Sequence, residues 1–248
     1  MKLVVQIPCL NEEATLPAAL KAIPRSIEGI SEVRILVIDD GSSDRTREVA
    51  IAHGADHVVR FTRHKGLASG FMAGLDAALK LGADIIVNTD ADNQYPGSEI
   101  PRLIAPILKG EADMTIGDRQ VSEVAHFSWT KQRLQVLGSW VVRKVSGTEV
   151  PDTTSGFRAL SREAALRINI VSEFTYTLES IIQAGKKRLA ISPLPIDARE
   201  TRPSRLFGST YEYVKRSVAT ILRIYAMYEP FKVFMILGGL LFSAGAVL

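Results

Sequence analysis

The chain has 248 residues, 46% of them hydrophobic and 23% charged. This composition supports a substantial core, excludes a chain that is disordered in bulk, and predicts one large domain or a domain with an appendage. A formal net charge of +3 is too small to indicate nucleic acid as a partner, although local basic clusters could still bind phosphates or anionic lipid.

The N-terminal stretch MKLVVQIPCLNEE begins with an apolar run that predicts a buried strand. The run is too short for a signal peptide and no small-residue cleavage site follows, so we expect the bulk of the chain on the cytoplasmic side. Cys9 lies at the end of this strand, where we expect a buried structural thiol. As the only cysteine it excludes an intrachain disulfide and gives no zinc cluster.

Strand and helix patterns alternate through the first hundred residues. Strands of nearly continuous Val, Ile and Leu alternating with helices predict an α/β fold, with a mostly parallel sheet covered on both faces. One predicted helix carries Gly66, Gly70 and Gly74 on one face, where they would let it lie close to the sheet. The predicted strands are KLVVQIP, VRILVIDDGSS, ADHVVRF and ADIIVNTDAD, and the helices are EEATLPAALKAI, SDRTREVAIAHG and KGLASGFMAGLDAALKLG.

Polar clusters follow three of these strands: PCLNEE the first, DDGSSD the second and DADNQ the fourth. DADNQ alone could be a solvated turn, but the carboxyl ends of parallel strands meet at one edge of a sheet, where ligands bind. The first cluster has no glycine-rich turn for a dinucleotide, and the chain has no P-loop motif. Acidic groups in place of glycine loops indicate phosphates held through Mg²⁺ or Mn²⁺.

The motifs IPCLNEE, VIDDGSSDRT, DADNQ and TSGFRALSREA together resemble those of family 2 glycosyltransferases with the GT-A fold. Within that family the chain is most similar to polyprenyl-phosphate sugar transferases, including dolichyl-phosphate mannose synthase. The likeness continues through KGLASGFMAGL, IGDR and RETRPSRL, over residues 3–206. GDR replaces the commoner GSR, and RETRPSR stands where R-x-x-G-E-S-K often occurs, so the donor sugar is not identified.

The resemblance implies inverting transfer of one sugar from a GDP- or UDP-linked donor to a membrane dolichyl or undecaprenyl phosphate. The donor site is expected at the ends of the first, second and fourth strands. Arg199 and Arg205 could close over the diphosphate as a mobile lid, or belong to a polar interdomain connector. Residues expected around the base and ribose are Pro8, Leu10, Asn11, Glu12, Asp40, Asp90 and Ala91.

Asp90 and Asp92 form a motif of the DxD type. The resemblance implies that Asp92 and Gln94 ligate the metal ion, while Asp90 lies near the ribose or binds a metal-bound water. The cation would bridge the diphosphate and stabilise charge on the leaving nucleotide, which gives Asp92 a catalytic role.

The acceptor side is expected in the second half of the chain. Arg119 ends the short strand MTIGDR, and Arg133 lies in the basic helix FSWTKQRLQVLGSWVVRKVSG. A basic helix is usually a solvated face, but both arginines match positions that hold the lipid phosphate in relatives, a task that suits the planar guanidinium. Asp152 could orient the acceptor or the sugar, or act as a general base. A phosphate is already ionised near neutral pH and does not require a strong base.

The tail begins with STYEYVKRSVATILRIYAMYEP, which either packs on the catalytic domain or lies at an anionic membrane surface. VFMILGGLLFSAGAVL then runs for sixteen residues without a charge, somewhat less than the roughly 20 that span a bilayer. We interpret it as a truncated transmembrane helix. Basic residues upstream would keep the catalytic domain cytoplasmic. The expected domains are 1–208 (catalytic), 209–230 (amphipathic interface helix) and 231–248 (transmembrane).

Two other functions remain open. A soluble or processive glycosyltransferase would act on a small acceptor or a polysaccharide, but the QxxRW motif usual in processive synthases is absent. A non-catalytic nucleotide-sugar-binding subunit would share the fold, but the intact DADNQ motif argues against it. The partners expected are the donor, the lipid acceptor, a membrane and, in addition, a second copy of the chain as a possible homo-oligomer.

Overall fold

The computed structural model describes the chain except residues 121–128, 174, 200–209 and 248, and describes no side chains for 129–136, 210–213, 244 and 247. The chain divides into two compact units, Met1–Ser204 and Arg205–Leu248.

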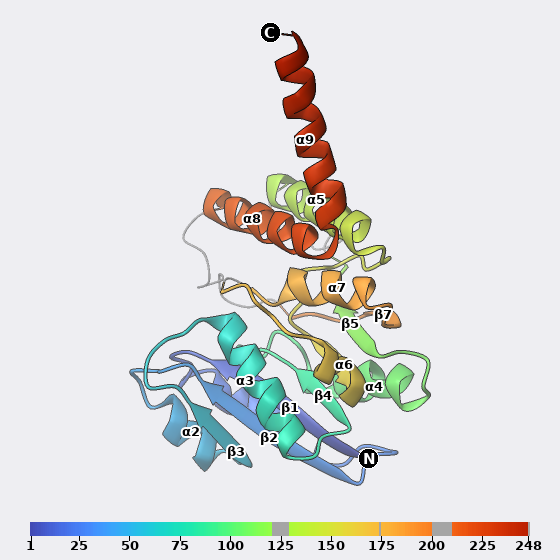
Figure 1. The fold of residues 1–248 in the computed structure, drawn as a ribbon. Helices are drawn as coiled ribbons and strands as arrows, with labels where there is room; N and C mark the ends of the chain where they lie inside the picture. Colours follow the sequence, from blue (N-terminus) through green and yellow to red (C-terminus); the bar gives the residue numbers. More distant parts are fainter. Residues whose placement is uncertain (121–128, 174, 200–209, 248) are drawn as a thin grey trace. The chain divides into compact units, whose positions relative to one another are not determined.

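The first unit is built on a seven-stranded sheet (Figure 1). Its strands are β1 (Lys2–Cys9), β2 (Glu32–Asp39), β3 (His57–Arg60), β4 (Ile85–Asn88), β5 (Met114–Asp118), β6 (Arg158–Ser161) and β7 (Ile191–Pro195). The spatial order is β3-β2-β1-β4-β6-β5-β7. Every neighbouring pair is parallel except the two that involve β6, which runs antiparallel to β4 and to β5. The predicted mostly parallel α/β sheet is therefore confirmed.

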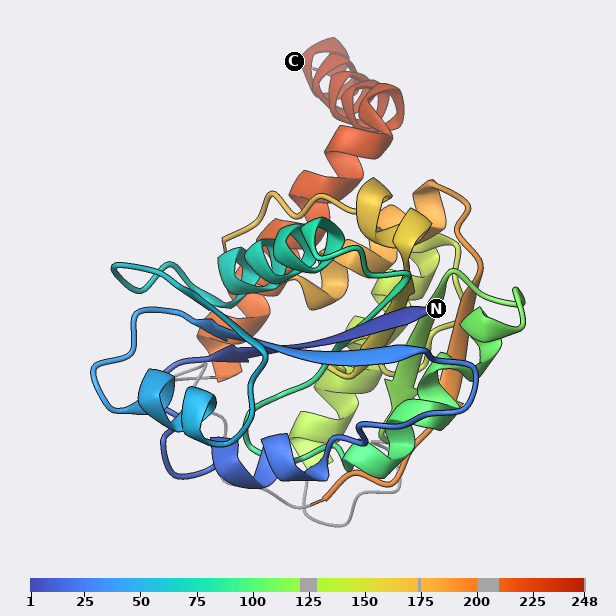
Figure 2. The same cartoon turned by 90° about the horizontal axis from the view of Figure 1, so that it is seen from below.

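The helices of this unit are α1 (Leu16–Ala22), α2 (Thr46–Ala52), α3 (Leu67–Lys80), the short 3₁₀ helix η1 (Gly97–Glu99), α4 (Ile100–Leu108), α5 (Trp129–Ser146), α6 (Arg162–Arg167) and α7 (Thr177–Lys186). Helices α1, α2 and α4 lie on one face of the sheet and α3 and α6 on the other (Figure 2). Alternate residues of β1, including Leu3, Val5 and Ile7, are fully buried in the core on the α1 and α4 side. Cys9 is buried as predicted, and burial raises the pKa of its thiol.

The three regularly spaced glycines of the predicted helix have different roles. At Gly74 an added Cβ would lie 2.9 Å from Ile38 Cδ1 and would also meet the Gln6 side chain, so α3 approaches the sheet closely there. At Gly70 it would make an ordinary contact of 3.7 Å with Pro8. Gly66 caps the helix with φ of 95°, a conformation that favours glycine. The expected close approach is thus confirmed at Gly74 and wrong at Gly66.

The sheet register brings the polar strand ends to one edge. Cys9 of β1 pairs with Asp39 of β2, so these two strands end at the same level. On the other side of β1, Gln6 pairs with Asn88, the last residue of β4. The segments that follow β1 and β2 therefore start beside each other, and the segment that follows β4 starts three residues earlier along β1, at the same edge of the sheet. The parallel arrangement predicted this common edge.

The second unit contains α8 (Thr210–Tyr228) and α9 (Pro230–Val247). The segments Val214–Tyr228 and Pro230–Ser243 meet at a bend of 106°, where Pro230 begins the second helix. Among the described residues no helix is by itself long and apolar enough to span a membrane, and only the two segments of this bent pair together have that length and composition. Large apolar side chains on α9 are exposed: Phe231, Phe234, Met235, Ile236, Leu237, Leu240, Leu241 and Phe242.

Candidate active site

The loops after β1 and β2 are joined by hydrogen bonds. The Asn11 backbone N–H donates to Ser42 Oγ at 2.9 Å, and the Ser43 N–H donates to Asn11 Oδ1 at 2.8 Å. The Glu12 N–H donates to Thr46 Oγ1 at 2.8 Å. Asn11 has φ of 55°, which an asparagine tolerates better than most residues. The predicted polar clusters after β1 and β2 therefore lie against each other. Of the other residues expected in this pocket, Leu10 is exposed and Pro8 is half-buried.

Asp40 is buried and fixes the loop that leads into α3. Its carboxylate accepts hydrogen bonds from the N–H groups of Lys65, at 2.7 Å, and Gly66, at 2.9 Å. His64 Nδ1 lies 2.8 Å from the same carboxylate. The sequence predicts a contact between Asp40 and the base or ribose. The structure adds that Asp40 shapes the loop beside that expected pocket.

The DADNQ segment forms a tight loop after β4. Asp92 Oδ1 accepts a hydrogen bond from the Gln94 N–H at 3.0 Å, across Asn93, which has φ of 59°. The Oδ1 atom of Asn93 is buried without a hydrogen-bond partner. Buried amide oxygens are nearly always satisfied in folded proteins, so this oxygen is available to accept a hydrogen bond from a ligand or water.

Asp90 lies at the centre of the charged groups. The backbone of Gly156 passes close to the Asp90 carboxylate. A Cβ added to Gly156 would lie only 3.0 Å from both carboxylate oxygens, so a glycine fits best at this position. Burial, and then the negative charge of Asp92, raise the pKa of Asp90 to about 7. The positive charges of Arg119 and Arg158 act in the opposite direction.

These donor atoms fit Mg²⁺ or Mn²⁺, because carboxylate and amide oxygens are the hard ligands that both ions prefer. Within the described residues no three His, Cys, Asp or Glu side chains form a cluster that could hold a metal. A site built on Asp90 and Asp92 would therefore need oxygens from Gln94 or from a bound diphosphate. Such a shared site is usual for Mg²⁺, which is commonly bound by one or two carboxylates together with substrate phosphates.

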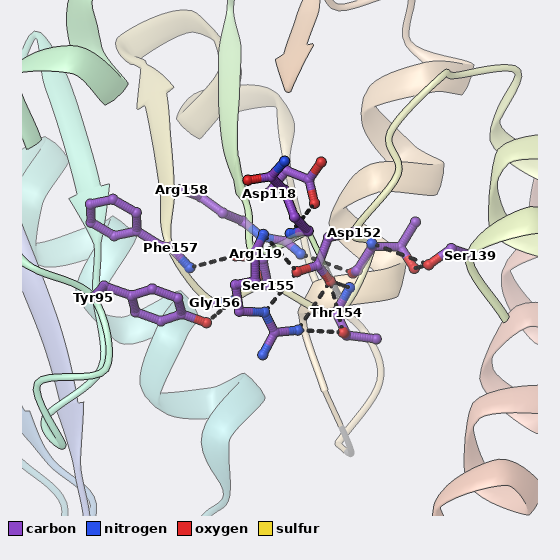
Figure 3. A network of polar contacts seen from close by, with 12 residues as sticks. Tyr95, Asp118, Arg119, Ser139, Asp152, Thr154, Ser155, Gly156, Phe157 and Arg158 are labelled. Atoms are coloured by element: carbon purple, nitrogen blue, oxygen red, sulfur yellow. Dashed lines mark hydrogen bonds and ion pairs between the residues drawn. The ribbon is translucent and has the colours of Figure 1, made fainter. Parts of the chain in front are cut away.

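Arg119, at the end of β5, is bound to Asp152 (Figure 3). Nε of Arg119 donates to Asp152 Oδ2 at 2.7 Å, and Nη2 donates to Asp152 Oδ1 at 3.0 Å. Nη2 also donates to the Thr154 hydroxyl at 2.7 Å. Burial alone would raise the pKa of Asp152. The positive charge of Arg119 outweighs this effect, together with hydrogen bonds from Arg119 and from the Thr154 hydroxyl, and the pKa of Asp152 is held below its usual range.

The segment between Asp152 and β6 is also held by residues to which the sequence assigned no role. The Tyr95 hydroxyl accepts a hydrogen bond from the Gly156 N–H at 3.2 Å, and the Tyr95 ring stacks on Phe157. The Ser139 hydroxyl of α5 lies 3.1 Å from the Thr153 hydroxyl. Arg158 is wholly buried behind the segment. For Arg158 the sequence carried one signal of a special role, namely a charged residue within the otherwise apolar stretch FRAL. Tyr95 and Ser139 gave none.

The structure thus brings together Asp90, Asp92, Arg119 and Asp152. The charges of Asp92 and Arg119 act on the pKa of Asp90, and Asp152 forms an ion pair with Arg119. The Arg199 N–H donates to the Gln94 carbonyl at 2.9 Å, which places the first arginine of the expected lid beside the DADNQ loop. The other two expected arginines are not placed. Arg205 lies outside the described residues, and Arg133 lies in α5 but its side chain is outside them.

Several known proteins are similar to this chain. The sequence model of the family described as glycosyl transferase family 2 matches residues 4–168. An uncharacterized glycosyltransferase of Mycobacterium tuberculosis is 36% identical over 182 residues, covering 73% of this chain and 78% of the relative. The polyprenol monophosphomannose synthase of Mycolicibacterium smegmatis is 30% identical over 228 residues, covering 87% and 84% of the two chains.

Similarity also extends to a further relative and to solved structures. The dolichol-phosphate mannosyltransferase of Pyrococcus furiosus is 31% identical over 225 residues, which cover 87% of this chain and 62% of the relative. The crystal structure of Mycobacterium tuberculosis glucosyl-3-phosphoglycerate synthase with Mn²⁺, UDP-glucose and phosphoglyceric acid has a TM-score of 0.72 at 24% identity and covers 91% of this chain and 80% of its own. That structure shares the fold. From its motifs, its sheet and these matches, the chain belongs to glycosyltransferase family 2.

Proposed function

We propose that this glycosyltransferase transfers one sugar from a GDP- or UDP-linked donor to a dolichyl or undecaprenyl phosphate, with inversion at the anomeric carbon. Relatives named as polyprenol monophosphomannose synthase and dolichol-phosphate mannosyltransferase support the acceptor class. The observation that carries the proposal is the Arg119–Asp152 pair, because it places a cation suited to phosphate beside a carboxylate that is poorly suited to act as a base.

The acceptor side follows from that pair. Asp152 is ionised, bound at both oxygens to Arg119, and has a pKa held below its usual range, so it has little tendency to take a proton from a hydroxyl group. A sugar or alcohol acceptor would need such a proton transfer, whereas a phosphate arrives already ionised. Nη1 of Arg119 is turned away from Asp152 (Figure 3) and could donate to a phosphate oxygen, with Arg133 as the second cation.

The donor side would use the strand ends described above. Asp92 and Gln94 would hold Mg²⁺ or Mn²⁺ with Asp90 beside them, and the ion would supply charge stabilisation to the leaving diphosphate. Glu12 and Asp40 lie on the loops after β1 and β2, where the nucleoside would bind. The backbone contact between Arg199 and Gln94 would carry the lid arginines to the diphosphate.

The second unit would bring the enzyme to its lipid substrate. The exposed apolar side chains of α9 would enter the bilayer, and α8, with its interspersed basic residues, would lie at the membrane surface. The catalytic unit would then be membrane-associated on the cytoplasmic side. This arrangement is the one predicted from the sequence for residues 209–248.

The test is transfer of labelled sugar into a lipid-soluble product. Purified protein is incubated with Mn²⁺, each of several labelled GDP- and UDP-sugars, and undecaprenyl or dolichyl phosphate in detergent. Parallel reactions contain free dolichol, which lacks the phosphate, or 3-phosphoglycerate, a soluble phosphorylated acceptor. We expect label in the lipid phase only with a polyprenyl phosphate. Transfer to 3-phosphoglycerate or to dolichol, without transfer to any polyprenyl phosphate, would overturn the proposal.

A further inference from the structure

Arg158, the first residue of β6, is a fully buried cation. Within the part of the chain that the structure describes, its hydrogen-bond partners are carbonyl and hydroxyl oxygens, not carboxylates. Its Nε donates to the Ser155 carbonyl at 2.8 Å and its Nη2 to the Thr153 carbonyl at 3.1 Å. Its Nη1 donates to the Thr177 carbonyl at 2.8 Å and to the Ser180 hydroxyl. The guanidinium also lies 5.5 Å from the centre of the Tyr176 ring.

Stability alone is a weak reason to keep a cation in this place. Removing a charge from water is costly, and well-packed apolar side chains often stabilise a core as much as, or more than, a buried charged network. What an apolar side chain cannot do is hold several oxygen atoms from two segments in a fixed geometry. Arginine can, because its planar group carries donors in several directions.

The oxygens that Arg158 holds belong to the segment that forms the acceptor side of the site. The Thr153 and Ser155 carbonyls accept hydrogen bonds from the Arg158 guanidinium. The residues that alternate with them, Asp152 and Thr154, accept hydrogen bonds from Arg119 through their side chains. The other two bonds of Arg158 reach the first turn of α7. Arg158 therefore joins the 152–156 segment to α7.

We propose that Arg158 is a positioning residue that sets the 152–156 segment against α7, so that Asp152 and Thr154 keep Arg119 in place for the acceptor. Arg158 acts through these residues and does not itself touch substrate. The identity of the acceptor rests on the function proposed above. The positioning role rests on the contacts of Arg158 alone.

The variants separate position from charge and from general stability. Arg158→Lys keeps the charge but concentrates its donors on one nitrogen, which cannot reach the two segments at once. Ser180→Ala removes one partner and leaves the arginine, and so remains informative if Arg158→Lys folds poorly. Arg162→Lys is the matched control, because Arg162 also donates to two backbone carbonyls, those of Leu79 at 3.4 Å and Ala83 at 2.9 Å, but contacts neither the segment nor α7 in the described structure.

The first measurement is amide hydrogen exchange in the full chain. The N–H groups of Thr154 and Gly156 are bonded to Asp152 Oδ1 and to the Tyr95 hydroxyl, both at 3.2 Å, and report on the segment directly. We expect Arg158→Lys to speed exchange at these two amides by about tenfold or more, and Ser180→Ala by a smaller factor, while Arg162→Lys leaves them within about twofold of wild type. Unchanged exchange in Arg158→Lys, or equal acceleration in the control, would overturn the proposal.

The second measurement separates positioning from a loss of folded protein. We expect Arg158→Lys to lower kcat/KM for the acceptor by about tenfold or more, while the Kd of the nucleotide-sugar with Mn²⁺ changes by less than about threefold. A parallel loss of donor binding would show that Arg158 only stabilises the whole unit, and would contradict the proposal. If the wild-type protein uses an acceptor other than a polyprenyl phosphate, the proposed function fails, yet the same comparison with that acceptor and the exchange data still decide the role of Arg158.

Discussion

Arg119 and Asp152 form a two-point ion pair, with Nε–Oδ2 and Nη2–Oδ1 distances of 2.7 and 3.0 Å. Both side chains are largely buried, with 13% of Arg119 and 3% of Asp152 exposed. Two parallel hydrogen bonds fix the orientation of the guanidinium as well as its position. The pair therefore links the stability of the unit to the geometry that would receive a phosphate.

The first prediction concerns this link. Asp152→Asn should lower the free energy of unfolding at pH 7 by about 3–5 kcal/mol, because it leaves the largely buried Arg119 without its counter-charge. Asp76→Asn is the control: it removes one partner of the exposed Asp76–Lys80 pair and should cost less than about 1 kcal/mol. Urea denaturation of the three proteins measures both values, and an equal midpoint for wild type and Asp152→Asn would contradict the prediction.

The same pair predicts a pH dependence. The folded-state pKa of Asp152 is lowered, so its contribution to stability is present above the unfolded pKa of about 3.9 and is lost as the pH falls through the lower folded value. The difference in unfolding free energy between wild type and Asp152→Asn should thus be constant from about pH 7 to 5 and shrink below about pH 4. A difference that instead shrinks as the pH rises above 5 would show that another group is responsible.

The second prediction concerns the metal. Asp92→Asn and Gln94→Ala should each lower kcat by about a hundredfold or more, because the leaving diphosphate would lose its counter-charge. Folding should be retained, with a Tm within about 4 °C of wild type. Chelation followed by readdition of Mn²⁺ should abolish and then restore transfer by the wild type. Full activity of either variant in metal-free buffer would show that these side chains do not hold a required ion.

The fold and the site differ in how far the sequence could predict them. Strand patterns and polar strand ends indicated a parallel sheet with Asp90 and Asp92 at its edge, because these features depend on local sequence and on a general property of such sheets. The Arg119–Asp152 pair could not be derived in this way. It requires β6 to lie antiparallel between β4 and β5, and that strand order joins segments far apart in the chain. The burial of Arg158 likewise depends on where α7 packs.

The third prediction concerns Asp40, which the sequence assigned to the nucleoside and the structure shows binding the N–H groups of Lys65 and Gly66. Asp40→Ala should raise the Kd of the nucleotide-sugar by about tenfold, since two backbone donors beside the expected pocket lose their acceptor. The metal dependence should stay the same. His64→Ala, which removes only the exposed partner of Asp40, should change the Kd little. Calorimetric titration measures each Kd, and unchanged binding by Asp40→Ala would remove Asp40 from the donor site.

The fourth prediction tests the second unit. Replacing Phe234 and Leu241, both exposed on α9, with lysine should strongly reduce sedimentation of the protein with anionic vesicles. Each charge placed in the bilayer costs about 2.5–3.5 kcal/mol on insertion scales. Leu166→Lys, at an exposed leucine of α6 in the first unit, is the matched control and should bind like wild type. Equal binding by the α9 variant would show that this helix does not enter the membrane.

The fifth prediction separates acceptor binding from donor binding through the two arginines expected to hold the lipid phosphate. Arg133→Ala should raise the KM for the polyprenyl phosphate by about ten- to a hundredfold, because it removes one charge-assisted contact that contributes about 1.5–3 kcal/mol to binding. Arg119→Ala should have the same effect and should also lower the Tm, because it leaves Asp152 buried without its partner. Arg119→Lys should restore the charge but only part of the affinity, since one ammonium cannot form two parallel hydrogen bonds.

The comparison is made by varying each substrate separately in detergent or liposomes. Lys144→Ala, at an exposed lysine on the same helix as Arg133, shows how much of any effect comes from charge on α5 alone. In all variants the Kd of the nucleotide-sugar with Mn²⁺ should change little, because the donor would be held by the loops after β1, β2 and β4. If the arginine variants instead lose donor affinity and keep a normal KM for the lipid, then Arg119 and Arg133 serve the diphosphate, and Asp152 orients a donor ligand instead.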